Sequence, residues 1–135
     1  MANRTKFYNK YGNKKITVAG ETFDSKKEYK RYCELKLLER AKIISNLRRQ
    51  VKYILIPAQY EKTTEKYTKG ARKGELKQGK LIERECSYIA DFVYKENDVD
   101  VVEDTKGCKK GGAYAVFTIK RKLMLYKYGI KIKEL

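Results

Sequence analysis

The sequence predicts a single domain of the mixed α/β (α+β) class, in which helices flank a mixed central sheet. Two segments, residues 26–42 and 114–128, carry apolar side chains at helical spacing. Between them, residues 51–57, 81–94 and 99–106 are rich in β-branched and aromatic residues, as strands are. The chain has no Pro- or Ser-rich linker and no internal repeat, so its 135 residues fit one domain with a substantial core.

Within this domain, 1–135, the N-terminal residues 1–15 form a basic arm with interspersed aromatic residues. Contact with a polyanion and a frayed, solvated terminus explain the arm equally well. Residues 16–18 and 22–23, on either side of Gly20-Glu21, predict a small β-hairpin. The candidate DNA contacts of the arm are Lys10, Lys14 and Lys15.

The first helix is predicted over residues 26–42, directly after an N-cap at Ser25. Glu28 stands three residues after this serine, and a capping box would tie its carboxylate back to the cap backbone. Glu28 also lies one and two turns from Tyr32 and Leu35, so it can aim a carboxylate at the sheet. From the helix alone, capping is the favoured role of Glu28.

The first strand is predicted over residues 51–57, with Gln50 at its entry and Pro57 at its end. Residues 61–80 follow as a basic, flexible loop that is too long for a plain turn. A nucleic-acid clamp that orders on binding and a solvated loop are about equally well supported. The candidate DNA contacts in this loop are Lys69, Arg72 and Lys73.

The next two strands, residues 88–94 and 99–106, predict a β-hairpin. A two-residue turn at Asn97-Asp98 would place Asp91 directly opposite Asp104, and alternation adds Lys106 to the same face. Two like charges side by side on one strand pair destabilise it unless a cation compensates them. A divalent metal ion would resolve that conflict.

Glu103 is the competing ligand, because a one-residue slip of the strand would exchange it with Asp104. Alternation argues against it, since Glu103 points to the opposite face together with Val101 and Thr105. Asp100 shares the face of Asp104 but lies nearer the turn, so we expect it to be solvated. Gln50 is a possible neighbour of the site.

The second helix follows a flexible basic connection, residues 107–112, and is predicted to end at Gly129. Residues 130–133 then alternate like a last strand. A solvated basic face explains most of the helix lysines, but some can approach a phosphate. The apolar residues at helical spacing are Val116, Ile119, Leu123 and Tyr126. The candidate DNA contacts here are Lys109, Lys110 and Lys120.

The composition favours a polyanionic partner. The chain has 33 Lys and Arg against 17 Asp and Glu, a formal net charge of +16, which suits nucleic acid. A membrane surface is the rival partner, but the sequence contains no long apolar run, signal-peptide core or acylation motif. Cys33, Cys86 and Cys108 form neither a CxxC pair nor a disulfide framework. We therefore expect a soluble protein of a reducing cytoplasm.

The residue types and motifs that the sequence lacks exclude several catalytic mechanisms. The chain has no histidine, which excludes Ser-His-Asp and Cys-His catalysis, histidine-bearing zinc sites and histidine-dependent nucleases. Its glycines form no GxxxxGK[ST] or GxGxxG pattern, so a nucleotide-phosphate cradle is not indicated. Any catalysis must use carboxylates, Lys, Tyr or Cys.

The αβββαβ order, with an aspartate in the second strand and Asp-x-Lys in the third, resembles the PD-(D/E)XK nuclease superfamily. The proline of that name is absent, since Ile89-Ala90 precede Asp91. More closely, the chain resembles a small phage-encoded family of endonuclease-like proteins related to Holliday junction resolvases and to phage endonuclease I. The resemblance rests on residues 10–15, 23–28, 88–92 and 102–107.

The resemblance implies a restriction-endonuclease-like core. It also favours metal binding over helix capping as the role of Glu28. In resolvase-like members a glutamate of the first helix joins the metal site, so Glu28 is expected to bind metal with Asp91 and Asp104. The resemblance makes Lys106 the catalytic lysine. Hard carboxylate oxygens suit Mg2+, for which Mn2+ can substitute.

These features predict a metal-dependent endodeoxyribonuclease, structure-selective and resolvase-like, acting in phage recombination or replication in the host cytoplasm. One site cuts one strand, so symmetric cutting of a four-way junction requires a homodimer. Lys106 would position the attacking water or stabilise the transition state. Two alternatives remain open: a noncatalytic basic nucleic-acid-binding protein, and a sequence-specific restriction-like endonuclease.

Overall fold

The computed structural model describes residues 14–106 and 109–135, so the predicted contact at Lys10 lies outside the described residues. The chain divides into two compact units. We call Met1–Val51 with Ala90–Leu135 the core unit, and Lys52–Ile89 the ribbon unit. The candidate catalytic residues all belong to the core unit.

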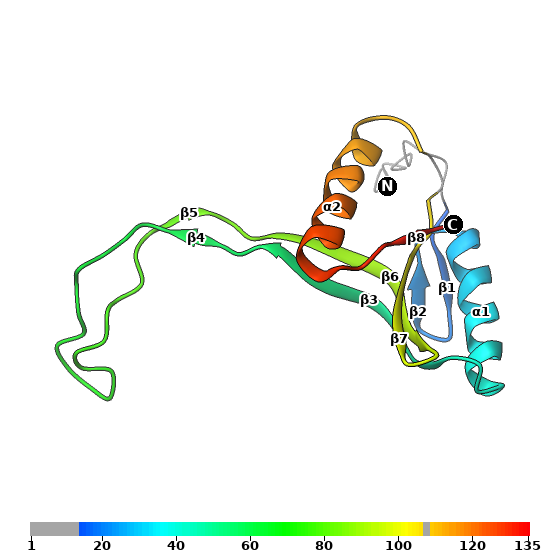
Figure 1. The fold of residues 1–135 in the computed structure, drawn as a ribbon, viewed down its shortest axis with the longest axis horizontal. Helices are drawn as coiled ribbons and strands as arrows, with labels where there is room; N and C mark the ends of the chain where they lie inside the picture. The colour runs from blue at the N-terminus through cyan, green and yellow to red at the C-terminus, as the bar shows by residue number, and fades with distance from the viewer. Residues whose placement is uncertain (1–13, 107–108) are drawn as a thin grey trace, which may run out of the picture. The chain divides into compact units, whose positions relative to one another are not determined.

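The described residues form a mixed α+β fold, as predicted. Four of their strands make one mixed sheet in the order β3-β6-β7-β8, in which β6 and β7 are antiparallel and β7 and β8 are parallel. In the core unit, α1 and α2 lie on opposite sides of β7 and β8 (Figure 1). The bounds are β1 Ile16–Val18, β2 Glu21–Phe23, α1 Lys26–Arg40, β3 Ser45–Ile56, β6 Cys86–Glu96, β7 Val99–Asp104, α2 Gly112–Tyr128 and β8 Lys133–Glu134.

The hairpin of β6 and β7 closes through the predicted two-residue turn. Glu96 pairs with Val99, and Asn97 and Asp98 have φ values of 51° and 61°, as a type I′ turn requires. The paired register continues to Phe92 opposite Glu103. Continued by one residue, the same register would set Asp91 opposite Asp104.

One face of the sheet packs on α1. The buried cluster there contains Leu35, Ile44, Phe92 and Tyr94. The helix begins after Ser25, whose side chain accepts a hydrogen bond from the Glu28 amide. It ends at Arg40, two residues before the predicted end, because Lys42 has a left-handed φ of 59°.

The apolar stripe predicted for the second helix is on its exposed side. Val116, Ile119 and Tyr126 are 54%, 61% and 90% exposed, whereas Phe117 and Met124 are buried. The predicted end is confirmed, since Gly129 caps α2 with a φ of 66°. The helix carries apolar residues on two faces. The face that packs against the rest of the protein is that of Phe117 and Met124, not the face with the predicted stripe.

Three predicted strands have different bounds in the structure. β3 starts at Ser45, six residues before the predicted start, because the polar run through Gln50 is itself strand. Residues 81–94 divide into β5, Leu81–Glu83, and β6. The last strand is Lys133–Glu134 rather than 130–133, since pairing with β7 begins only at Lys133.

The ribbon unit contains β-pairing where the sequence predicts an irregular loop. β4, Gln59–Tyr60, is antiparallel to β5, and an isolated bridge joins Lys66 to Leu76. Turn hydrogen bonds, such as Gly74 N–H to the Tyr67 carbonyl at 2.9 Å, close its tip. Residues 61–80 are thus a long hairpin.

Neither α1 nor α2 is long and apolar enough to span a membrane.

Candidate active site

Glu28 uses its two carboxylate oxygens for different partners. Oε2 accepts a hydrogen bond of 2.9 Å from the backbone N–H of Asp24, beside the helix cap. Oε1 faces β3, where the Gln50 amide lies 3.3 Å away and an Arg49 nitrogen 3.5 Å away. The side chain is only 2% exposed. Glu28 therefore holds the residue before the Ser25 cap with one oxygen, rather than the cap backbone itself, and directs the other toward the sheet.

Gln50 joins Glu28 to Asp91. Its Nε2 donates to Glu28 Oε1 at 3.3 Å and to Asp91 Oδ1 at 3.4 Å, so one oxygen of each carboxylate points at the same small group. Gln50 has a φ of 51°, an unfavourable value for a residue with a side chain. This left-handed residue interrupts strand alternation, and consecutive Arg49 and Gln50 consequently both reach Glu28.

Asp91 is held by the end of β7. The backbone N–H and the hydroxyl of Thr105 both donate to Asp91 Oδ2 at 2.8 Å. Burial, followed by the negative charge of Asp104, raises the pKa of Asp91 to about 6, and Glu28 adds to the effect. The hydrogen bonds from Thr105 act in the opposite direction. The charges of Asp104 and Glu28 thus both act on Asp91, although burial is the larger cause of its raised pKa.

Lys106 pairs with Asp104 at the end of the same strand. The distance from Lys106 Nζ to Asp104 Oδ1 is 2.9 Å, and Asp104 is 4% exposed. The ammonium also lies 3.8 Å from the centre of the Phe117 ring of α2. The structure thus brings together the Asp-x-Lys pair that the sequence indicates. This contact is also the strand-end salt bridge that an isolated Asp-x-Lys would form.

Glu103 faces away from these groups, into the layer covered by α1. Arg31 donates to both of its carboxylate oxygens, at 2.8 and 2.6 Å, and the Tyr94 hydroxyl donates at 2.6 Å. Burial alone would raise the pKa of Glu103, but the hydrogen bonds from Arg31 and Tyr94 outweigh it and lower the pKa. Glu103 is therefore an ionised, paired core residue.

Gln50 stands where a cation would meet Glu28 and Asp91. Among residues 14–106 and 109–135, no three Asp, Glu, Cys or His side chains already surround a common point. The donor set nevertheless fits a hard divalent ion, because oxygens of Glu28 and Asp91 converge on the Gln50 amide and Asp104 is next to Asp91. A half turn of the amide would present its own oxygen in the same place.

The predicted DNA contacts are spread over both units. Lys14 and Lys15 are exposed just before β1, and Lys69, Arg72 and Lys73 are exposed in the tip of the ribbon unit. At that tip Arg72 lies 4.7 Å from the centre of the Tyr67 ring. In the core unit, Lys109 and Lys110 are exposed before α2, and Lys120 is half-buried within it.

Sequence reasoning missed Arg49 and Thr105. Arg49 bonds the Thr22 carbonyl at 3.0 Å and lies 3.8 Å from the centre of the Phe23 ring, and no local motif marks it. Alternation placed Thr105 on the face of Glu103. β7 ends at Asp104, however, so alternation no longer governs the next side chain. The Asp-Thr-Lys spacing was the only available signal for Thr105.

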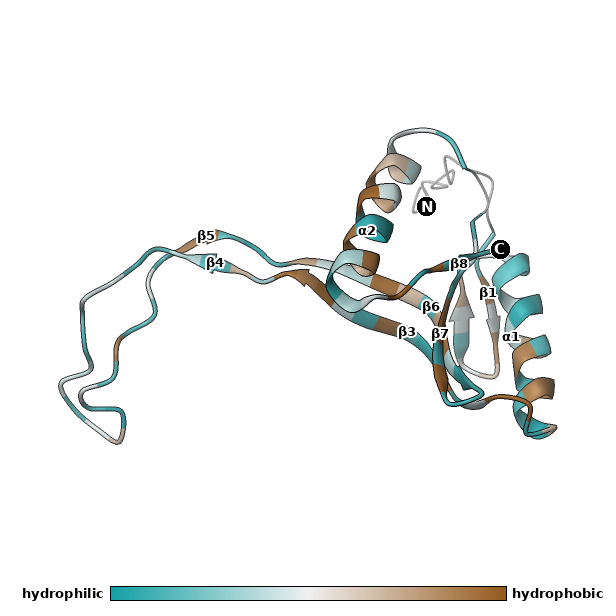
Figure 2. Ribbon diagram, viewed as in Figure 1, coloured by the Kyte–Doolittle hydropathy of each residue, from teal (hydrophilic) through white to brown (hydrophobic). Residues whose placement is uncertain are grey.

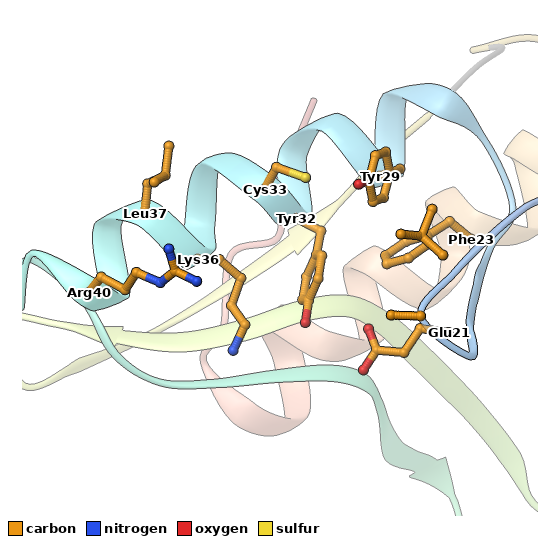
Figure 3. A pocket seen from close by; sticks show the side chains of 10 residues that line it. Glu21, Phe23, Tyr29, Tyr32, Cys33, Lys36, Leu37 and Arg40 are labelled. Carbon is orange, nitrogen blue, oxygen red and sulfur yellow. The ribbon is translucent and has the colours of Figure 1, made fainter.

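A separate pocket of about 440 Å3 lies between α1 and the β1–β2 hairpin (Figure 3). The ring of Phe23 lies 5.1 Å from that of Tyr29 and 5.2 Å from that of Tyr32, which joins the hairpin to the helix. Cys33 and Lys36 complete much of its wall. The lining includes none of the clustered carboxylates, so this pocket is distinct from the candidate active site.

The pKa of Asp91 predicts how stability depends on pH without divalent ions. The folded pKa of about 6 lies above the ordinary value of 3.8, so folding binds a proton between these pH values. This contribution is complete below pH 4 and is lost as the pH rises through 6. In EDTA, Asp91→Asn should therefore gain roughly 2 to 3 kcal/mol relative to the wild type between pH 4 and 7. Urea denaturation across this range measures the difference.

The exposed Asp100→Asn is the matched control for this measurement, and it should show no such trend. A constant difference between Asp91→Asn and the wild type at every pH would show that the Asp91 carboxyl is not perturbed in the folded protein.

Comparison with known proteins identifies one family. A family model described as "Protein of unknown function (DUF1064)" matches residues 8–134. No curated protein and no solved structure matches the chain. The match covers both units and every candidate catalytic residue.

Proposed function

Because the chain belongs to the DUF1064 family, described as proteins of unknown function, we propose from the site itself that it is a metal-dependent endodeoxyribonuclease. The observation that carries the proposal is that Gln50 joins Glu28 of α1 to Asp91 of β6, while the charge of Asp104 of β7 acts on Asp91. Buried carboxylates beside lysines do not strengthen the binding of phosphates, so a protein that only binds polyanions has no use for them. A metal-dependent hydrolase needs them to hold its metal ion. The resemblance to PD-(D/E)XK nucleases points to the same chemistry.

The metal would be held by Glu28, Asp91 and Asp104, with Gln50 beside them. A bound Mg2+ or Mn2+ supplies Lewis-acid polarisation of the phosphodiester and acidifies water. Before it binds, the charges of Asp104 and Glu28 add repulsion to the burial that raises the pKa of Asp91. A divalent ion removes this repulsion, so metal binding is coupled to deprotonation of Asp91.

The chain's own residues orient the reacting groups. Thr105 fixes Asp91 through two hydrogen bonds of 2.8 Å, which leaves Oδ1 directed at Gln50. The Lys106 ammonium, 2.9 Å from Asp104, is placed to stabilise negative charge that develops on the phosphate oxygens. Packing of Lys106 on the Phe117 ring restricts its rotamers, so less entropy is lost in the transition state.

The proposed substrate is branched DNA, in particular a four-way junction. The net charge of +16 suits contact with phosphates, which carries no sequence information by itself. Lys14, Lys15, Lys69, Arg72, Lys73, Lys109, Lys110 and Lys120 are the proposed contacts. Paired cuts across a junction require two sites related by a two-fold axis, so we propose a homodimer.

A cleavage assay tests this function. The protein is incubated with a labelled four-way junction, a linear duplex and a single strand of the same sequence, with Mg2+, with Mn2+ or with EDTA. We expect metal-dependent nicking, fastest on the junction. Binding of all three DNAs with no cleavage in either metal would favour a noncatalytic binding protein. Cleavage of the duplex at one sequence only would favour a restriction-like enzyme.

A further inference from the structure

α2 exposes an apolar stripe that no described element covers. Val116, Ile119, Leu123 and Tyr126 follow one another at spacings of three, four and three residues. Val116, Ile119 and Tyr126 are at least half exposed, and Leu123 is half-buried. Figure 2 shows apolar segments recurring along α2. At 100° per residue, the centre of the stripe lies about 130° around the helix from the buried Phe117 and Met124.

The spacing of the stripe indicates what shape would cover it. Apolar residues alternately three and four apart form the narrow seam of a helix pair, rather than the broad apolar face of a helix packed on a sheet. Such a seam accepts knobs from one facing helix over about two heptads. The partner is therefore expected to present a helix.

The charges beside the stripe indicate the sign of the charge that a partner would carry. Lys120 and Lys127 lie along one side of it and Lys122 along the other, at the positions that flank the seam of a coiled coil. α2 contains no acidic residue between Gly112 and Tyr128. Pairing α2 with a second copy of itself would bring these lysines together across the seam, and like charges at such positions oppose association.

We propose that the exposed face of α2 docks an acidic amphipathic helix of a partner protein. Leu, Ile or Val side chains of the partner would fill the seam formed by Val116, Ile119, Leu123 and Tyr126. Glutamates on both sides of the partner's apolar stripe would meet Lys120, Lys122 and Lys127. The apolar stripe contains none of the proposed catalytic residues, and the docking surface shares only Lys120 with the proposed DNA contacts.

The probe is a labelled three-heptad peptide with Leu at positions a and d and Glu at e and g. Repulsion between its glutamates keeps it from pairing with itself at neutral pH. Fluorescence anisotropy measures its binding to the full-length protein. We expect micromolar binding that weakens as salt rises, and at least about a tenfold loss on Ile119→Ser.

Leu125→Ser is the matched control. Leu125 is 55% exposed on the same helix but lies away from the stripe, so its substitution should change the affinity by less than about twofold. Both serine variants replace an exposed residue, and thermal unfolding verifies that they fold equally well.

Three results would overturn the proposal. The first is no binding of the glutamate peptide, or equal losses for Ile119→Ser and Leu125→Ser. The second is equally tight binding of a peptide with Lys at e and g, which would mean that charge does not select the partner. The third is a dimer in analytical ultracentrifugation that Ile119→Ser alone dissociates, which would assign the face to a second copy.

Discussion

Asp104→Asn should abolish metal-dependent cleavage of DNA while leaving DNA binding intact. The substitution keeps the size of the side chain but removes the charge that pairs with Lys106 and that the proposed divalent ion would need. A loss of about 4 kcal/mol of transition-state stabilisation corresponds to about a thousandfold lower rate. Single-turnover cleavage of the labelled junction in Mg2+ gives the rate, and a gel-shift measurement in Ca2+ gives the affinity.

Asp100→Asn is the matched control for this experiment. Asp100 belongs to the same strand, is exposed and lies 3.9 Å from Lys95, so its loss should leave cleavage unchanged. The proposed role of Asp104 would be refuted if Asp104→Asn cut the junction as fast as the wild type. Loss of binding together with cleavage would instead assign Asp104 to folding, which a thermal melt would reveal.

Arg31→Ala should destabilise the folded protein by about 3 to 5 kcal/mol. Arg31 is the bidentate partner of Glu103, which is fully buried, and the substitution leaves that carboxylate without its main countercharge. The lowered pKa of Glu103 also predicts the direction in which this stability changes with pH. Stability contributed by this pair is present at neutral pH and is lost as the pH falls through the folded pKa. Urea denaturation at pH 7 measures the change.

Lys36→Ala is the control, because Lys36 is exposed and its partner Glu39 is partly exposed, so this pair should contribute less than about 1 kcal/mol. Replacing Arg31 and Glu103 together by leucine should recover much of the loss, since no unpaired carboxylate is then buried at position 103. An Arg31→Ala variant within 1 kcal/mol of the wild type would contradict the assigned role of the Glu103 pair.

The hairpin of β6 and β7 could be predicted because its signals are local. Asn97 and Asp98 tolerate the positive φ that a two-residue turn needs, and alternation then sets the faces of the following residues. The same reasoning failed once strand geometry ended, as at Thr105. It could not foresee Arg49, since the left-handed Gln50 changes which face the preceding side chain occupies.

The second helix shows a different limit. The pattern predicted its existence and its end at Gly129, both of which the structure confirms. It did not predict the buried face, because Phe117 and Met124 form one apolar row and Val116 and Ile119 lie on another. Helical spacing defines rows of side chains, but only contacts with other elements decide which row faces the core.

By itself, the sequence determined the charge of the protein, the order of the two helices and the core strands, and the two-residue turn that joins β6 to β7. These depend on composition and on preferences that act over a few residues. Only the tertiary structure decided that Glu28 meets Gln50 and Asp91, that Glu103 is buried beside Arg31, and that α2 exposes an apolar stripe. Those contacts join segments far apart in the chain, and the packing of helices on the sheet creates them.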